Sequence, residues 1–517
     1  MRPASGAMQL DRYTDIGELG EKVRIAVKRL VGPLLAVLAI EAIYLGYSGH
    51  PGAWAFALMA AGTCIALFVW SRRAIGLPLL PVMVVQSLII YAVPIAAGHE
   101  VIGTYPPDFL FSAGIEVLIF DIAMVVAWAM GMQLFRLSPP TSHVLHEFNR
   151  AGAKGWARLG FIMIAGATAF EVLQGLDLLD SLYSAMPSGS EAILYALVSV
   201  VSACGFFLVA LNIGGGEASL PEKAVFWLLL VANAMMSASD FLLSSVTANL
   251  ITVAIGLFWS SERVPWRYLT VVLLALSFLN MGKYTMRARY WENADAPATH
   301  RSLAQLPACY AEWTQVSYNA VLENKTEQAQ AASDKKLQAN KNQTLLDRVD
   351  NLQNLLFVID AIQTNHIKPL EGKTYSVIPP LLVPRILWPE KPRTHEGQIL
   401  LNVHFGRQDM ESTFTTYIAW GLLPEAYGNF GPITGSIALG VFLGVLFAWI
   451  ENFTARKLLV STEGFLSLSL LMNLMNSFEM VASVLVTSTF QSFVVIVAAS
   501  LPFVHRTVAG RPVPEEV

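Results

Sequence analysis

The densest cluster of chemically useful side chains lies between residues 384 and 397. Arg385, Lys391, Arg393 and His395 place three permanent cations and a histidine within 11 residues. An arginine presents a planar fork of donors that suits phosphate, a lysine is a point charge, and a histidine can exchange a proton near neutral pH. The combination predicts a site for a diphosphate whose charge grows as it leaves. A basic rim that touches lipid headgroups is the alternative.

Prolines surround this cluster. They are Pro379, Pro380, Pro384, Pro389 and Pro392. Because proline fixes φ and lacks an N–H, the spacing predicts a stiff, extended stretch without regular helix or central strand. Such a stretch can hold Trp388 and the neighbouring cations in place.

A second basic cluster lies near residue 285. Lys283, Arg287 and Arg289 stand beside Tyr284 and Tyr290. We expect either a second phosphate clamp that faces the first or an ordinary belt of interface anchors.

A third stretch, residues 411–431, combines carboxylates, hydroxyls and aromatics with several glycines. Glu411 or Glu425 could act as a general base if desolvation raises its pKa. Tyr427 and Asn429 suit sugar binding. The alternative is an ordinary junction between a loop and a helix.

Composition sets the class of protein that must position these side chains. Of the 517 residues, 54% are hydrophobic and 14% are charged, whereas a soluble protein has about 25% charged residues. The mean hydropathy is +0.51. These values exclude a soluble globule and predict an all-α, polytopic integral membrane protein. The net charge of −4 gives no basic field for nucleic acid, and no Walker, Rossmann or zinc motif is present.

Apolar runs of membrane-spanning length predict about twelve transmembrane helices. They cover residues 31–47, 53–70, 74–97, 112–135, 156–176, 190–212, 221–237, 240–260, 264–281, 431–450, 463–478 and 481–503.

Basic residues indicate the orientation of these runs. Six Lys or Arg precede the first run, and none lies in 48–52, 98–111 or 177–189. By the positive-inside rule, both termini are cytoplasmic and the polar segment 282–411 is periplasmic. The chain therefore divides into a membrane block of about nine helices (1–281), a large periplasmic loop with amphipathic helices (282–430) and a membrane block of about three helices (431–517).

Acidic residues inside apolar runs are costly and often functional. The candidates are Glu41, Glu116, Asp121, Glu171 and Asp240. They predict either a proton or cation path, or carboxyls that form hydrogen bonds between helices. These acidic residues do not form the tight cluster of carboxylates that would predict a metal site.

Two runs of letters resemble a known family. The run PRILWPEKP (384–392), followed by EAYGNFG (425–431) and an apolar span, is similar to the Wzy-type polymerases of O-antigen and exopolysaccharide repeat units. The matching positions are Pro384, Arg385, Trp388, Pro389, Lys391, Pro392, Glu425, Tyr427, Asn429, Phe430 and Gly431. The resemblance covers about 384–431 and is only topological elsewhere.

The resemblance implies a GT-C-like glycosyltransferase of the bacterial inner membrane that uses neither metal nor cofactor. Its substrates are glycans linked to undecaprenyl diphosphate, and its expected partners are membrane lipids and the proteins that regulate chain length and export. Cations stabilise the departing diphosphate and a base takes the acceptor proton. The diphosphate candidates are Arg385, Lys391, Arg393, Arg287 and Lys283; the base candidates are His395, Glu411 and Glu425; further contacts come from Trp388, Tyr427 and Asn429.

Three other functions share part of this pattern. An O-antigen-ligase-like transferase has the same topology and leaving group, and the match at 384–392 favours the polymerase. A transporter or flippase of lipid-linked glycans would show two related halves, which the nine-plus-three arrangement lacks. A non-catalytic component of a secretion complex would tolerate changes at the external cations.

Overall fold

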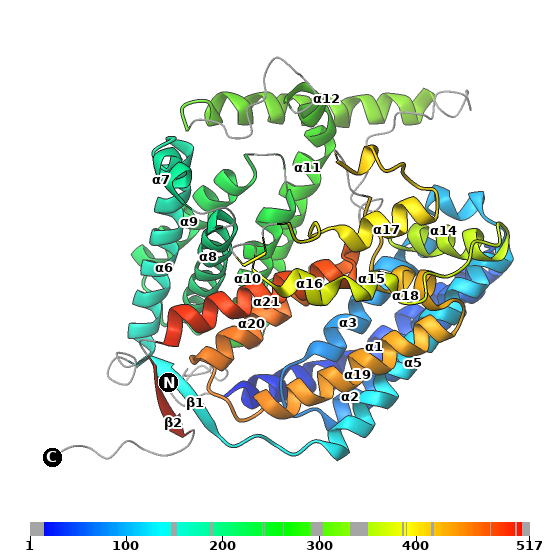
Figure 1. Cartoon of the computed structure of the whole chain (residues 1–517), viewed down its shortest axis with the longest axis horizontal. Helices are drawn as coiled ribbons and strands as arrows, with labels where there is room; N and C mark the ends of the chain where they lie inside the picture. The colour runs from blue at the N-terminus through cyan, green and yellow to red at the C-terminus, as the bar shows by residue number, and fades with distance from the viewer. Residues whose placement is uncertain are drawn as a thin grey trace, which may run out of the picture. The chain divides into compact units, whose positions relative to one another are not determined.

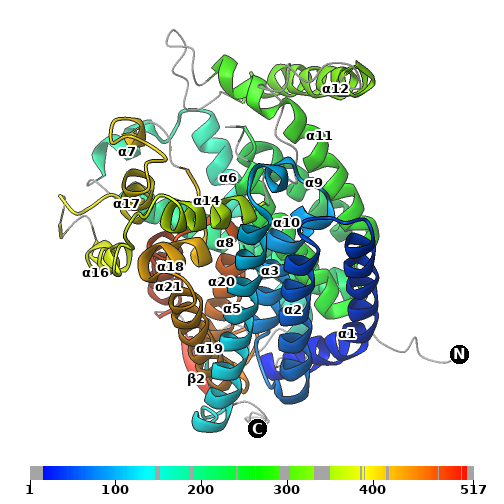
Figure 2. The same ribbon diagram turned by 90° about the vertical axis from the view of Figure 1, so that its right-hand side faces the viewer.

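The structure is a computed structural model, drawn in Figure 1 and, turned by 90°, in Figure 2. It describes residues 15–145, 152–186, 190–239, 241, 243–261, 263–290, 303–330, 350–384, 387–388, 390–414, 418–475, 477–501 and 504–508.

The described chain is mostly helical, and eight helical stretches are long and apolar enough to cross a membrane. They are α1 (Ile16–Tyr47), α2 (Ala53–Arg73), the continuous series α3 (Leu79–Ser87), η1 (Leu88–Ala92) and α4 (Val93–Ala96), α5 (Pro107–Leu134), α6 (Gly152–Gly175), α8 (Ser190–Gly214), α19 (Thr434–Thr454) and α21 (Ala482–Ser500). The expectation of an all-α, membrane-embedded chain is thereby confirmed at this coarser level.

The remaining four expected spans also form helices. They are α9 (Leu220–Ser237), α10 (Leu243–Ser261), α11 (Trp266–Tyr290) and α20 (Thr462–Met475). The last has 14 residues, and at 1.5 Å per residue it is about 21 Å long, shorter than the ~30 Å hydrocarbon core.

The chain forms two compact units, which are described separately. The first unit contains residues 1–11 and 150–348, and the second contains 12–149 and 349–517. These units reflect contacts in space, whereas the three blocks expected from the sequence reflect order along the chain. The long polar segment contributes to both units.

In the first unit, α6 lies beside α8, and α8 lies beside α10 (Figure 1). Helices α6 and α8 approach closely at Gly160 and Gly205, where a Cβ on Gly205 would lie 2.9 Å from the Gly160 carbonyl oxygen. Buried Phe206 and Phe226 meet edge to face at 6.0 Å. The unit also contains α7 (Asp180–Ala185) and α12 (Leu306–Gln330).

In the second unit, α19 runs along α5 although the two are far apart in sequence (Figure 1). Gly440 and Gly444 form a Gly-x-x-x-Gly pair on the contact face. A Cβ at Gly444 would lie 2.2 Å from the Met124 carbonyl oxygen. Such small residues allow membrane helices to approach closely.

Glu451, near the end of α19, ties the same bundle together. Its side chain is buried and accepts four N–H groups, from the indoles of Trp70 (3.3 Å) and Trp128 (2.9 Å) and the amides of Ile75 (2.8 Å) and Gly76 (3.2 Å). A buried carboxylate with this many donors stabilises the packing of the segments that supply them, here α2, the residues that follow it, and α5.

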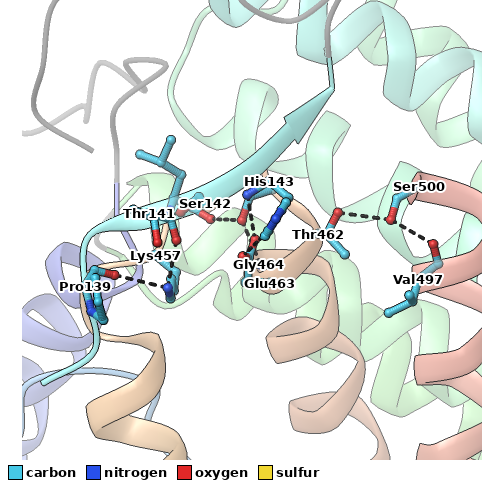
Figure 3. A network of polar contacts seen from close by, with 12 residues as sticks. Pro139, Thr141, Ser142, His143, Lys457, Thr462, Glu463, Gly464, Val497 and Ser500 are labelled. Carbon is cyan, nitrogen blue, oxygen red and sulfur yellow. Dashed lines mark hydrogen bonds and ion pairs between the residues drawn. The ribbon is translucent and has the colours of Figure 1, made fainter. Parts of the chain in front are cut away.

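The described strands are β1 (Thr141–Leu145) and β2 (Val504–Val508), which pair antiparallel. Figure 3 shows His143 of β1 against Glu463 of α20: its backbone N–H and its Nδ1 lie 3.0 and 2.8 Å from the two carboxylate oxygens. Nearby, Lys457 Nζ donates to the carbonyls of Pro139 and Thr141. These bonds fix the segment that follows α5 both to the connection between α19 and α20 and to the start of α20.

Short helices carry the candidate motifs of the second unit. They are η2 (Glu100–Thr104), α14 (Leu352–Gln363), α15 (Lys373–Ser376), α16 (Ile378–Leu382), α17 (Glu396–His404), η5 (Ser412–Phe414), α18 (Leu422–Phe430) and η6 (Ser477–Glu479). In Figures 1 and 2, α14 to α18 gather near one end of α5 and α19. The amphipathic α14 packs on both α5 and α18.

The proline-rich stretch departs from its prediction at one point. Pro379 and Pro380 lie inside α16, at its first turn. The expectation of no regular helix was wrong there, because the first turn of a helix needs no N–H from these positions.

Candidate functional site

The basic cluster of residues 384–397, which we call the cationic run, follows α16 in the chain. Within it, the Lys391 side chain folds back onto that helix. Its Nζ donates to the carbonyls of Leu381 (2.8 Å) and Val383 (2.7 Å). Carbonyls at a helix end have no partner within the helix, so Lys391 serves as a cap. Trp388, 41% exposed, stands on the same loop, whereas Arg385 lies outside the described residues.

Arg393 joins the cationic run to the third stretch. Its Nη1 donates to the Thr413 carbonyl at 3.5 Å, and its guanidinium lies 4.4 Å from the centroid of the Phe414 ring. Glu396 is 4.0 Å away at the limit of an ion pair. The Arg393 side chain keeps 32% of its surface exposed, so the guanidinium can still meet a ligand.

His395 is the N-cap residue of α17, and a neighbouring side chain orients its ring. Its Nδ1 lies 2.7 Å from Gln398 Oε1. Because an amide oxygen only accepts, Nδ1 carries the proton and the basic lone pair of the neutral ring lies on Nε2. This is the tautomer that a general base at Nε2 requires.

The first turn of α17 rests on the first turn of α21. A Cβ at Gly397 would lie 2.7 Å from Ser483 Oγ and 3.6 Å from a methyl of Val481. The cationic run is therefore seated directly on the end of a helix of membrane-spanning length.

Glu425 is fully buried where α15, α18 and α21 meet. Thr374 Oγ1 donates to one carboxylate oxygen and the Ala482 amide to the other, both at 2.6 Å. Burial raises the pKa of Glu425 to about 7, although these two hydrogen bonds lower it. In this arrangement the carboxylate caps α21 and faces protein on every side, so it positions helices and does not present a base to a substrate.

Asn429 and Tyr427 lie beside Glu425 on α18 and form further hydrogen bonds around it. Asn429 Nδ2 donates to Thr374 Oγ1 and to the Glu425 carbonyl, both at 2.8 Å. Tyr427 is buried and its hydroxyl accepts from Gln363 at 3.2 Å. Burial raises the pKa of Tyr427 to about 12, so the phenol stays neutral. We name the group Thr374, Glu425, Asn429 and Ala482 the Glu425 junction.

Glu411 differs from Glu425 in its surroundings. It is exposed, and its backbone carbonyl accepts the Phe414 N–H at 3.1 Å. Its carboxylate remains accessible to a substrate. Of the two predicted carboxylate bases, the structure leaves only Glu411 exposed.

Lys283 and Arg287 belong to the first unit, on α11. Lys283 is fully buried. Arg287 donates from Nε (3.2 Å) and Nη2 (2.8 Å) to the carbonyl of Phe241, which has a positive φ of 57°. The fork of Arg287 thus supports a tight turn between α9 and α10.

Arg407 is a residue that the sequence reasoning missed. Its Nη1 donates to Asn354 Oδ1 at 2.6 Å, and its guanidinium lies 5.1 Å from the Phe357 ring and 5.9 Å from Trp420. Burial lowers its pKa, yet an arginine remains charged at neutral pH. Among the described residues, no carboxylate forms an ion pair with it. A single arginine between Gly406 and Gln408 gives no local signal in the sequence, and only its aromatic partners in the fold reveal it.

Comparisons with known proteins add no relative to this picture. No protein-family model, curated protein or solved structure matches the chain.

Proposed function

We propose that the chain is an integral membrane glycosyltransferase that polymerises glycan repeat units carried on undecaprenyl diphosphate. The observation that carries the proposal is the contact between the cationic run and a helix long enough to span a membrane. Helix α17, which follows Arg393 and His395, packs on the first turn of α21. A lipid diphosphate is anchored at such a boundary, with its tails in the membrane and its charge at the helix ends.

The proposed topology completes this reading. In this proposal about twelve spans cross a bacterial inner membrane, with both termini on the cytoplasmic side and residues 282–411 in the periplasm. The distribution of Lys and Arg favours this orientation. The substrate glycan then reaches the cationic run from the periplasmic side.

The reaction is a direct displacement. An acceptor hydroxyl oxygen bonds to the anomeric carbon of the donor glycan, the bond from that carbon to the diphosphate oxygen breaks, and the electron pair leaves with the lipid diphosphate. His395 Nε2, or Glu411, takes the hydroxyl proton. Arg385 and Arg393 stabilise the charge on the leaving oxygen, while Lys391 holds the loop that presents them.

The decisive experiment is reconstitution of the pure chain in lipid nanodiscs with undecaprenyl-diphosphate-linked repeat units, followed by sizing of the products. We expect a ladder of polymer without any nucleotide sugar. Transfer of finished glycan to another acceptor, without a ladder, would indicate a ligase, and no product at all would contradict an enzyme.

Matched variants locate the activity. Removal of one charge-stabilising donor costs roughly 10²–10³-fold in kcat, so we expect this loss for Arg393→Ala and Arg385→Ala. The control is Arg263→Ala, an exposed arginine that belongs to neither basic cluster. Equal activity of all three variants would remove the cationic run from the mechanism.

A further inference from the structure

A cavity with both polar and apolar lining residues lies within the first unit. Its volume is about 420 Å³, within the range of about 300–1,000 Å³ typical of ligand sites. Helices α6, α8, α9 and α10 line it, together with Leu303 and Leu306. All of these residues belong to one compact unit.

One wall is a connected set of hydrogen bonds around Glu171. The carboxylate accepts Asn233 Nδ2 at 2.9 Å and Ser237 Oγ at 3.4 Å. Asn249 Nδ2 in turn donates to Asn233 Oδ1 at 2.8 Å and to Ser202 Oγ at 3.4 Å. Since the protein engages the amide nitrogen of Asn249, the group that Asn249 offers a ligand is its oxygen.

Aromatic rings form a second wall. Phe170 and Tyr195 meet edge to face, with centroids 6.0 Å apart and an angle of 84° between planes. Gln174 Nε2 donates to Tyr195 Oη at 2.7 Å and fixes the phenol. Ser199, an exposed serine, adds a hydroxyl at the rim.

The charges of the cavity restrict its ligand. No Lys or Arg occurs among the described lining residues, so a phosphate would find no countercharge. Glu171 is the one carboxylate among them, and no described trio of His, Cys, Asp or Glu could hold a metal ion. Acceptors, hydroxyls and aromatic rings, with no cation among the described lining residues, match a molecule with many hydroxyls on an amphipathic ring.

We propose that this cavity binds a neutral sugar residue, with Glu171 and the Asn249 oxygen accepting its hydroxyls and Phe170 or Tyr195 meeting its apolar face. The proposal rests on the proposed function in one respect, since the natural ligand is then one sugar of the glycan chain. It assigns this sugar to a site in the first unit, whereas the cations proposed for the diphosphate belong to the second unit.

The test uses the full chain in nanodiscs and three free sugars, D-glucose, D-galactose and N-acetyl-D-glucosamine, observed by saturation-transfer NMR. We expect transfer to at least one sugar and about tenfold weaker binding in Glu171→Gln and in Ser199→Val. Glu171→Gln keeps the size and one acceptor oxygen, and Ser199 is exposed, so both variants should fold. The control is Asn473→Leu in α20, whose amide donates to its own helix at Ser469.

Each outcome separates this proposal from the proposed function. Absence of transfer, or equal transfer in wild type and both cavity variants, would overturn the sugar site. Heat from sodium binding that Glu171→Gln abolishes, without sugar binding, would identify a cation site and overturn it as well. Sugar binding without polymer formation would remove the enzyme and keep the site, whereas polymer formation with an unchanged KM in both variants would do the reverse.

Discussion

Two glutamates in apolar surroundings, one in each unit, have opposite environments. Glu425 is fully buried, and both of its oxygens accept hydrogen bonds of 2.6 Å from within the protein. Glu171 also accepts two hydrogen bonds, one of them a long 3.4 Å, and it lines a cavity of about 420 Å³. The difference teaches that burial alone does not mark a site: a site needs hydrogen-bonding capacity that the fold leaves open to a cavity.

The largest expected effect is on stability, when each glutamate is removed. Glu425→Ala leaves Thr374 Oγ1 and the Ala482 amide without an acceptor, at about 1–3 kcal/mol for each donor. We expect the apparent Tm in detergent to fall by roughly 5–10 °C. Glu171→Ala should cause less than half of that fall, because water in the cavity can hydrate Asn233. Equal falls would show that both glutamates are only structural.

The second effect is on the pH dependence of stability. The folded-state pKa of Glu425 is about 7, above the ordinary 4.5, so the folded protein binds this proton more tightly than the unfolded chain. The stabilisation is fully present below about pH 4.5 and is lost as pH rises to about 7. Its size is about 3 kcal/mol.

Glu425→Gln cannot titrate and therefore isolates this contribution. We expect the Tm of the variant relative to wild type to rise between pH 5 and pH 8. Other titrating groups are common to both proteins and cancel in the difference. Parallel profiles would mean that Glu425 keeps the same charge throughout.

The sequence predicted the spans better than the sites because hydropathy is a local property. The eight membrane-length stretches overlap eight of the expected runs. The motif identified Glu425, but its partners Thr374 and Ala482 lie 51 and 57 residues away. Nothing local indicates such a partner, so the sequence could not show that both Glu425 oxygens are engaged within the protein.

Glu171 illustrates the opposite case. Its position inside an apolar run predicted either a proton or cation path or a hydrogen bond between helices. The bond to Asn233, 62 residues away, fits the second prediction. The cavity beside it depends on four helices at once and could not be predicted from any one of them. Arg407 was missed for a related reason, since its partners Asn354, Phe357 and Trp420 come from other segments.

A third, smaller effect tests how closely the cationic run is held beside the Glu425 junction. Gly397→Ala places a Cβ 2.7 Å from Ser483 Oγ, and we expect a loss of about 1–3 kcal/mol from overpacking, read as a lower apparent Tm. Ser483→Ala should restore it, because the Ser483 hydroxyl is buried and has no hydrogen-bond partner among the described residues. The control is Gly46→Ala, where nothing lies within 4 Å. A fall in Tm that the second substitution does not reverse would contradict this contact.

The smallest effect extends the comparison from carboxylates to cations. Lys391 is used within the protein, on the Leu381 and Val383 carbonyls, and Lys391→Met should speed hydrogen exchange over residues 378–392 with little change in Tm, since these carbonyls can be hydrated. Lys373→Met, at an exposed lysine of α15, should leave exchange unchanged. Faster exchange with polymerisation retained would show that Lys391 shapes the loop. Unchanged exchange with polymerisation lost would show that Lys391 acts on the diphosphate. A side chain whose hydrogen bonds are used within the protein would then still serve a site, contrary to the comparison of Glu425 with Glu171.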